Sequence, residues 1–236
     1  MKRIFLITLT CASLQAFPQS TGVSEKHYGT NTGEIIFSGG EVKTGGVKLD
    51  NIVRFTMFFH FQHQAHFDFS QHVGLYTGIG VRNVGFINKI KSLSGEDAKL
   101  KQRSYSIGIP IALKLGNMEK HSYISLGVEA EMMFAYKEKI FYKGYKSKNH
   151  KWFSDNVNLF NPSAFFELHG KKGGFIRAKY YLLDFLKDND QSFFLPDSSG
   201  ELIPYHPSSS KLFYISIGNT IKMKKHAKKH VTKDNA

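Results

Sequence analysis

The chain has 236 residues and a formal net charge of +13, from 32 Lys and Arg against 19 Asp and Glu. This length suits one domain rather than two. The mean hydropathy is −0.29, and no apolar run in the body of the chain approaches the ~20 residues that a membrane helix needs. Composition therefore argues against helical membrane spans, whereas the 21 Phe and 11 Tyr are many for a soluble domain.

The N-terminus predicts export. Lys2 and Arg3 precede an apolar segment that ends at Leu9, and small residues follow it. This order is typical of a secretory signal peptide, which we place at residues 1–20. A buried first strand is the alternative, but nothing in the segment alternates. Cys11, the single cysteine of the chain, lies inside it, so the mature chain is expected to lack disulfides and thiol chemistry.

Alternating stretches follow in chain order. A weak one near 34–42 comes first, and a longer one over 53–67 has its apolar residues at odd positions. After a turn at 69–72, a third stretch begins at Val73. Its apolar residues move from odd to even positions near Asn83, which predicts a β-bulge there.

The cleanest pattern covers residues 104–115, where apolar side chains at odd positions alternate with small or polar ones at even positions. A period of two over twelve residues predicts a strand with one apolar face. The stretch 124–137 repeats the pattern with opposite parity, so that Tyr136 shares the apolar face and Lys137 the polar one. Only the turn-sized segment 116–120 separates the two. The remaining alternating stretches are 160–168, 176–182 and 213–221.

The connections alternate between short and long, so every long loop is expected at the same end. Outer-membrane barrels have short periplasmic turns and long extracellular loops. The sequence therefore predicts an all-β fold: a closed antiparallel up-and-down transmembrane β-barrel of about eight strands within residues 21–223, followed by a basic disordered tail, 224–236. The expected turns are 69–72, 116–120 and 170–174, and the expected loops are 43–51, 88–102, 143–158 and 186–209.

The predicted inner face carries charges of both signs. Eight strands enclose a space that side chains just fill, and charges there are tolerable when paired and hydrogen-bonded. An Arg or Lys facing lipid would cost about 2–4 kcal/mol near the midplane, which decides the parity. We interpret the charges as a structural network that closes the lumen, with a transport path as the alternative. Its predicted members, beside the inward Asp68, are Arg54, Arg82, Lys114, Glu129, Glu131, Glu167, Arg177 and Lys179.

Two chemical interpretations compete with this structural one. His60, His63 and His66 could suggest a metal site, but in an extended strand His63 points away from the other two. Barrel enzymes that cleave lipid chains use serine and histidine as nucleophile and base, yet no spacing here singles out a Ser–His–acid set. The sequence predicts no catalytic residues, no metal and no cofactor.

The positive charge invites a nucleic-acid hypothesis, which export from the cytoplasm disfavours. We expect contacts with outer-membrane lipid and lipopolysaccharide, whose phosphates Lys and Arg neutralise, and an envelope protein as a further partner. Simple solvation of loop charges is the alternative and stays open. The basic residues are scattered along the chain, which also disfavours a nucleic-acid surface. Two groups lie in predicted loops: Lys89, Lys91, Lys99, Lys101 and Arg103 in one or at its end, and Lys143, Lys146, Lys148 and Lys151 in another.

The segment 68–87, DFSQHVGLYTGIGVRNVGFI, resembles the small outer-membrane β-barrel family of Bacteroidetes that is often described as PorT-like. The segments 103–110 and 179–182 look like strands of the same family. The resemblance covers roughly residues 33–223 and implies an outer-membrane barrel without a cofactor, of which some members assist a secretion machine. Barrels of this type usually end on an aromatic residue, whereas this chain ends in a basic tail.

These observations favour a non-enzymatic outer-membrane barrel that serves envelope structure or acts as an accessory of an envelope or secretion assembly. One alternative is a barrel enzyme acting on lipid A or phospholipid acyl chains. Another is a soluble, lipocalin-like ligand carrier.

Overall fold

The computed structural model describes residues 26–92, 94–197 and 201–222. The predicted signal peptide, with Cys11, and the predicted tail at 224–236 lie outside these ranges. No helix of the described residues has the length and hydropathy to cross a bilayer. The strands are β1 (Lys26–Thr44), β2 (Val47–Lys48), β3 (Asn51–Ile52), β4 (Arg54–Thr56), β5 (Phe61–Asp68), β6 (Val73–Lys91), β7 (Asp97–Asn117), β8 (Ser122–Tyr142), β9 (Tyr145–Trp152), β10 (Phe160–His169), β11 (Gly174–Tyr181), β12 (Gln191–Phe194), β13 (Leu202–Tyr205) and β14 (Pro207–Lys222).

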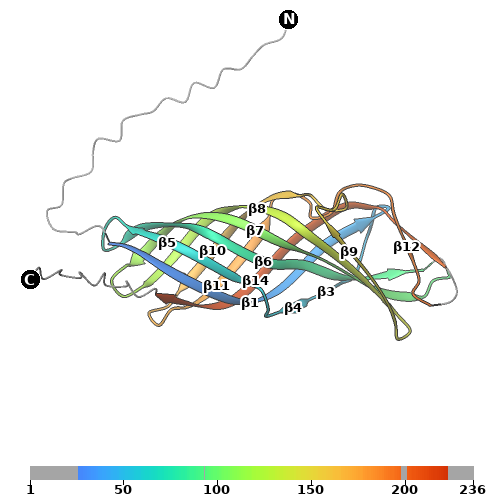
Figure 1. Ribbon diagram of the computed structural model, residues 1–236, viewed down its shortest axis with the longest axis horizontal. Helices are drawn as coiled ribbons and strands as arrows, with labels where there is room; N and C mark the ends of the chain where they lie inside the picture. The colour runs from blue at the N-terminus through green and yellow to red at the C-terminus, as the bar shows by residue number, and fades with distance from the viewer. Residues whose placement is uncertain (1–25, 93, 198–200, 223–236) are drawn as a thin grey trace, which may run out of the picture.

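Eight of these strands form a closed antiparallel ring in the order β1, β5, β6, β7, β8, β10, β11, β14. Pairing of β14 with β1 closes the ring (Figure 1). Closure leaves no sheet edge along the ring, so the backbone groups of its strands find partners within the sheet. The predicted all-β, closed up-and-down barrel of about eight strands is confirmed.

The two ends of the barrel differ. The tight connections 69–72, 118–121 and 170–173 lie at one end, where the described chain also begins and finishes (Figure 1, left). At the other end, which we call the loop end, β2 to β4 lie between β1 and β5, β9 follows β8, and the β12–β13 hairpin lies between β11 and β14. The predicted segregation of turns and loops is confirmed.

The predicted long loop at 88–102 is wrong. β6 continues to Lys91 and β7 already begins at Asp97. Within these extensions Ile90 and Leu100 are buried, while Lys99 is exposed. A strand whose outer face meets water and whose inner face meets an apolar core alternates lysine with aliphatic residues. The high charge of this segment is the reason why the sequence predicted a loop.

The predicted bulge at Asn83 is also wrong. The pairing of β6 with β7 keeps one register from Val73 opposite Leu115 to Lys91 opposite Asp97. The even positions of β6 therefore point inward throughout. What changes near Asn83 is the chemistry of the lumen, which becomes apolar towards the loop end.

The bulge lies on β8 instead. Ser106 is opposite Met133 and Tyr105 is opposite Ala135, so Phe134 is the extra residue. An extra residue reverses the parity of the rest of the strand. Tyr136, predicted to face outward, is consequently buried inside at 1% exposure, and Lys137, predicted inward, is partly exposed.

The loop-end half of the barrel has a conventional apolar core. The β12–β13 hairpin and the segment around Phe185 and Leu186 pack into its interior at the loop end. This half is thus apolar inside and charged outside, and the half nearer the turns is the reverse. The core includes Ile36, Val84, Phe86, Ile90, Leu100, Met133, Tyr136, Ile140, Phe193, Ile203, Tyr205 and Leu212.

The predicted single strand over 53–67 is interrupted. On β1, Gly33 is opposite Phe61 but Ile36 is opposite Thr56, so β1 advances by three residues while its partner advances by five. The two additional residues leave the sheet between β4 and β5. Phe59, in this segment, has a φ of 66°.

The inner and outer faces are exchanged between the two halves of the barrel, so Leu→Ala should have different effects at two positions of β7. Leu100→Ala removes a fully buried side chain from the loop-end core and should lower the free energy of unfolding by about 2–5 kcal/mol. Leu113→Ala, on the outward face of β7 at 46% exposure, should cost less, about 1 kcal/mol, because detergent fills the space and only part of the apolar transfer free energy is lost. Urea unfolding in micelles measures both, and equal losses would contradict the inversion.

Candidate functional site

The candidate site is a network of buried charges in the lumen, and Glu34 of β1 lies at its centre. Glu34 Oε1 accepts hydrogen bonds from Arg82 Nε at 2.7 Å and Arg177 Nη1 at 3.0 Å. Ser216 Oγ donates to Glu34 Oε2 at 2.5 Å. Both guanidinium groups also donate to Gln62 Oε1, at 2.6 and 2.9 Å. One carboxylate and one amide oxygen thus hold two like charges together.

Towards the loop end, Glu129 joins Arg82 to Lys179. Its Oε1 accepts from Arg82 Nη1 at 2.5 Å, and its Oε2 accepts from Lys179 Nζ at 2.6 Å. Lys179 also pairs with Glu131, which accepts a hydrogen bond from Ser106 Oγ at 2.6 Å. Both glutamates come from β8, two positions apart, and therefore point to the same side of the wall.

Towards the turn end, Arg177 pairs with Glu167 of β10. Glu167 Oε2 lies 2.8 Å from His169 Nε2 and accepts from Ser125 Oγ at 3.1 Å. The charged groups therefore form one chain of alternating sign across the lumen. In order, its charged members are Glu131, Lys179, Glu129, Arg82, Glu34, Arg177 and Glu167, and the ring of His169 bonds to the last of them.

Every strand of the ring contributes a polar side chain to this network. β1, β6, β8, β10 and β11 supply the charges, while Gln62 of β5, Ser106 of β7 and Ser216 of β14 supply hydrogen bonds. Each charged member is at most 7% exposed. Charges this deeply buried are tolerable because each has an opposite partner and further hydrogen bonds.

Lys114 belongs to a separate cluster at the turn end. It pairs with Asp68, and its Nζ lies 3.2 Å from His66 Nδ1. An ammonium group can only donate, so Nδ1 is the acceptor. The proton of the neutral ring is then on Nε2, which lies 2.9 Å from Thr30 Oγ1.

Arg54, predicted as a member of the network, lies apart from it. Its guanidinium donates to the backbone oxygen of Asn83 at 3.0 Å and to Asn83 Oδ1 at 2.7 Å. No carboxylate of the described residues pairs with it. The displaced register of β4 explains the difference, because the pairing of β5 with β6 has ended at Phe61 opposite Val81, and Arg54 bridges β4 to β6 beyond that point.

The network predicted from the sequence lacks Glu34, Gln62 and His169. Ile35 and Phe37 point outward from β1, which places Glu34 inward, but Ile36 is also apolar and hides the alternation. Of the three histidines weighed as metal ligands, His60 and His66 are buried and His63 is exposed. The described residues contain no group of three side chains placed to hold a metal ion.

Glycines make the room that these large side chains need. A Cβ at Gly108 would lie 2.2 Å from Glu129 Oε1 and 2.8 Å from Glu131 Cγ. One at Gly74 would lie 2.7 Å from Asp68 Oδ1. These two glycines therefore permit the buried acids to lie against the wall.

A cavity of about 280 Å³ opens at the turn end of the lumen. Its inner end is bounded by His66 and His169, which also bond to the two charged clusters. At the level of the network, the inward side chains of Gln62, Arg82, Glu129 and Arg177 are at most 3% exposed. The cavity is lined by Tyr28, Thr30, His66, His121, Tyr123, His169, Lys171, Lys172, Gly173, Thr220 and Lys222.

No protein-family model and no curated protein matches the sequence. Among solved structures, Ail, the attachment invasion locus protein of Yersinia pestis in complex with the heparin analogue sucrose octasulfate, is 13% identical, with 82% of this chain and 99% of that chain covered and a TM-score of 0.38. Neisserial surface protein A is 10% identical, with 84% and 100% covered and a TM-score of 0.40. The more specific resemblance to PorT-like barrels stays a prediction.

The network predicts that two glutamates contribute very differently to the free energy of unfolding. Glu129→Gln leaves Arg82 and Lys179 with one fewer negative partner in a buried site, and we expect a loss of about 3–5 kcal/mol in the free energy of unfolding. Glu41→Gln, in an exposed pair with Lys48, should change it little. Denaturant titration of the refolded barrel tests this, and a neutral Glu129→Gln would show that the network does not stabilise the fold.

Proposed function

We propose that the protein is an integral outer-membrane β-barrel with a side-chain-filled lumen, which serves envelope structure or acts as an accessory of an envelope assembly and catalyses no reaction. The observation that carries this proposal is a belt of exposed apolar side chains around the ring. Each of the eight wall strands contributes to the belt. One member from each, in ring order, is Phe37, Phe61, Ile79, Ile111, Leu126, Phe166, Ile176 and Ile215.

Water is a poor solvent for such a surface. Leu126 is 67% and Ile111 is 54% exposed, and burying an aliphatic side chain of this size is worth about 1.5–3 kcal/mol. Soluble monomers rarely expose apolar patches beyond roughly 300–600 Å². A continuous belt around the barrel supports hydrocarbon as its surroundings, because lipid removes these side chains from water.

The height of the belt fits a bilayer. On β7 the outward apolar run extends from Tyr105 to Leu115, which is about 34 Å along the strand at ~3.4 Å per residue. At a tilt of about 40° this gives ~26 Å along the barrel axis, close to the ~25 Å apolar band of outer-membrane barrels. At its upper rim the rings of Tyr105 and Phe134 are 6.3 Å apart, and those of Phe134 and Trp152 are 5.9 Å apart. Aromatic rings of this kind suit the membrane interface.

The orientation follows from the two ends. Outer-membrane barrels place short turns in the periplasm and long loops outside. The predicted signal peptide supports the same route. We therefore assign the turn end to the periplasm and the loop end, with its apolar core, to the outside. The resemblance to PorT-like barrels supports an accessory role in an envelope or secretion assembly.

The contents of the lumen favour this function over the two alternatives. A ligand carrier needs an internal cavity at the level of the belt, where this barrel holds ion pairs. In an enzyme, a histidine base must accept the proton of the nucleophile. The His66 nitrogen beside Thr30 already carries a proton, because the other ring nitrogen accepts from Lys114, and His169 bonds to Glu167. Recovery in the soluble periplasm would favour the carrier, and an altered lipid A profile in a deletion strain would favour the enzyme.

Two equally exposed positions separate a membrane barrel from a soluble one. Leu126, in the belt, and Val47, at the loop end, are 67% and 66% exposed. In water, Leu126→Arg would be neutral, but facing lipid it should cost about 2–4 kcal/mol. Val47→Arg should be neutral in both cases. The measurement is the heat-modifiable gel shift of protein assembled into vesicles, and an unaffected Leu126→Arg variant would contradict membrane insertion.

A further inference from the structure

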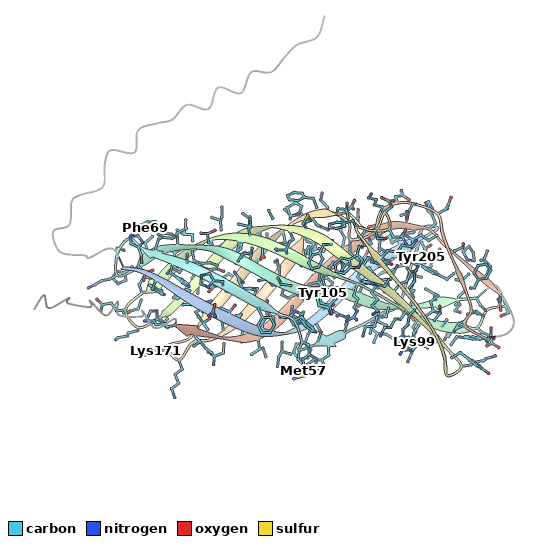
Figure 2. The ribbon with its side chains drawn as sticks, viewed as in Figure 1. Met57, Phe69, Lys99, Tyr105, Lys171 and Tyr205 are labelled. Atoms are coloured by element: carbon cyan, nitrogen blue, oxygen red, sulfur yellow. The ribbon has the colours of Figure 1, made fainter. Side chains whose placement is uncertain are left out.

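The outward face of the loop-end half carries rows of lysine. Strand register places Lys99 of β7 opposite Lys89 of β6. In the next row, Lys101 of β7 is opposite Lys139 of β8, which is in turn opposite Lys148 of β9. Directly paired residues of antiparallel strands project from the same face. Figure 2 shows Lys99 beyond Tyr105, towards the loop end.

A third row lies nearer the apolar belt. It contains Arg103 of β7, opposite Lys137 of β8, which is opposite His150 of β9. The even residues of β7 between these rows, Leu100 and Gln102, are fully buried, so the odd ones face away from the core. We call this surface the basic ladder, which consists of Lys89, Lys99, Lys101, Arg103, Lys137, Lys139, Lys146, Lys148 and His150.

Among the described residues, acids compensate little of the charge of the ladder. Of its members, Lys89 has an ion pair, a loose one of 4.0 Å to Asp50. Glu138, on the intervening position of β8, is buried and accepts a hydrogen bond from Tyr136. Like charges directly opposite one another destabilise a sheet. Burial, followed by the repulsion of Arg54 and other neighbouring cations, lowers the pKa of Lys101 to about 8.

Protection of a sheet edge explains only part of this surface. β9 pairs with β8 alone, and lysines such as Lys146 and Lys148 keep an open edge from recruiting another strand. However, Lys101 and Lys139 lie on β7 and β8, which have partners on both sides. Their alignment needs a different explanation, and an anionic ligand laid across the strands supplies one.

The height of the ladder identifies the ligand. Arg103 lies two residues and Lys99 six residues beyond Tyr105, which is about 7 and 20 Å along the strand. At a tilt of ~40°, Lys99 is then roughly 15 Å beyond the aromatic rim. The headgroup layer of one leaflet is only about 5–8 Å thick. A phospholipid phosphate therefore reaches the lowest row, and a headgroup that continues outward is needed for the upper two.

We propose that the basic ladder binds the phosphorylated sugar headgroup of lipopolysaccharide in the outer leaflet, with its phosphates against the lysine rows and its acyl chains on the belt beneath. This proposal rests on the proposed membrane insertion, and it adds the place and the chemistry of the contact. The aromatic rim formed by Tyr105, Phe134 and Trp152 lies between the two parts of the ligand.

The test uses the full chain assembled in nanodiscs and four probes: lipopolysaccharide, the same lipopolysaccharide with its phosphates removed, phosphatidylglycerol, and soluble polyphosphate. The ladder variant replaces Lys101, Lys139 and Lys148 by Gln. Its matched control replaces Lys120, Lys171 and Lys172, which are exposed at the turn end, and changes the net charge equally.

We expect the ladder variant to bind lipopolysaccharide roughly 100-fold more weakly than the wild type, about fivefold per lysine near an anionic surface. The control should retain wild-type affinity, and removal of the phosphates should weaken binding to the wild type by a similar factor. Heat-modifiable migration of both variants shows that they have folded.

Four results would overturn the proposal: unchanged binding by the ladder variant, equal loss in the control, equal affinity for phosphatidylglycerol, or equal affinity for soluble polyphosphate. The last would assign the ladder to a soluble polyanion. A wild-type chain that inserts into vesicles but binds no lipopolysaccharide overturns this proposal alone. A chain that binds lipopolysaccharide without inserting contradicts the proposed function instead.

Discussion

The pairing of Glu34 with Arg82 and Arg177 is the interaction on which the architecture depends. It joins β1, the first strand of the ring, to β6 and β11 across the lumen, so that these three strands are held through the centre of the barrel as well as along its wall. The chain of alternating charges then extends this connection to Glu131 on one side and to Glu167 on the other. A slip of one residue in any strand would turn its charges towards lipid and its aliphatic side chains inward, and the network therefore specifies register as well as filling the lumen.

The same wall faces two different solvents. Nearer the turns, apolar side chains point outward and charges inward, which suits hydrocarbon outside the barrel. Nearer the loop end, lysines point outward and a core containing Phe86, Leu100 and Tyr136 lies inside, which suits water. β6 and β7 pass through this change in one continuous register, because only the residue types at inward and outward positions exchange. β8 accommodates it differently, with a bulge at Phe134 that brings Tyr136 into the core.

The sequence predicts which side chains point outward wherever the outer face of a strand meets a single solvent. Residues 104–115 alternate cleanly because every odd position faces outward at the apolar belt. The pattern failed where its meaning reversed: Ile90 and Leu100 alternate with lysines as a water-facing wall requires, and the charge suggested a loop. Glu34 was missed because Ile36 follows it on the same inward face, where the apolar core begins. Arg54 was misplaced because two residues leave the sheet after β4, an event set by tertiary packing that no periodicity reveals.

The central claim is that one strand changes the solvent it faces without changing register. Single cysteines introduced along β7 in a Cys11→Ser background, spin-labelled and assembled in vesicles, measure this through collision rates with oxygen and with a water-soluble nickel complex. The account predicts oxygen maxima at residues 107, 109, 111, 113 and 115, and nickel maxima at residues 99, 101 and 103. High nickel accessibility at both sets of positions would contradict it.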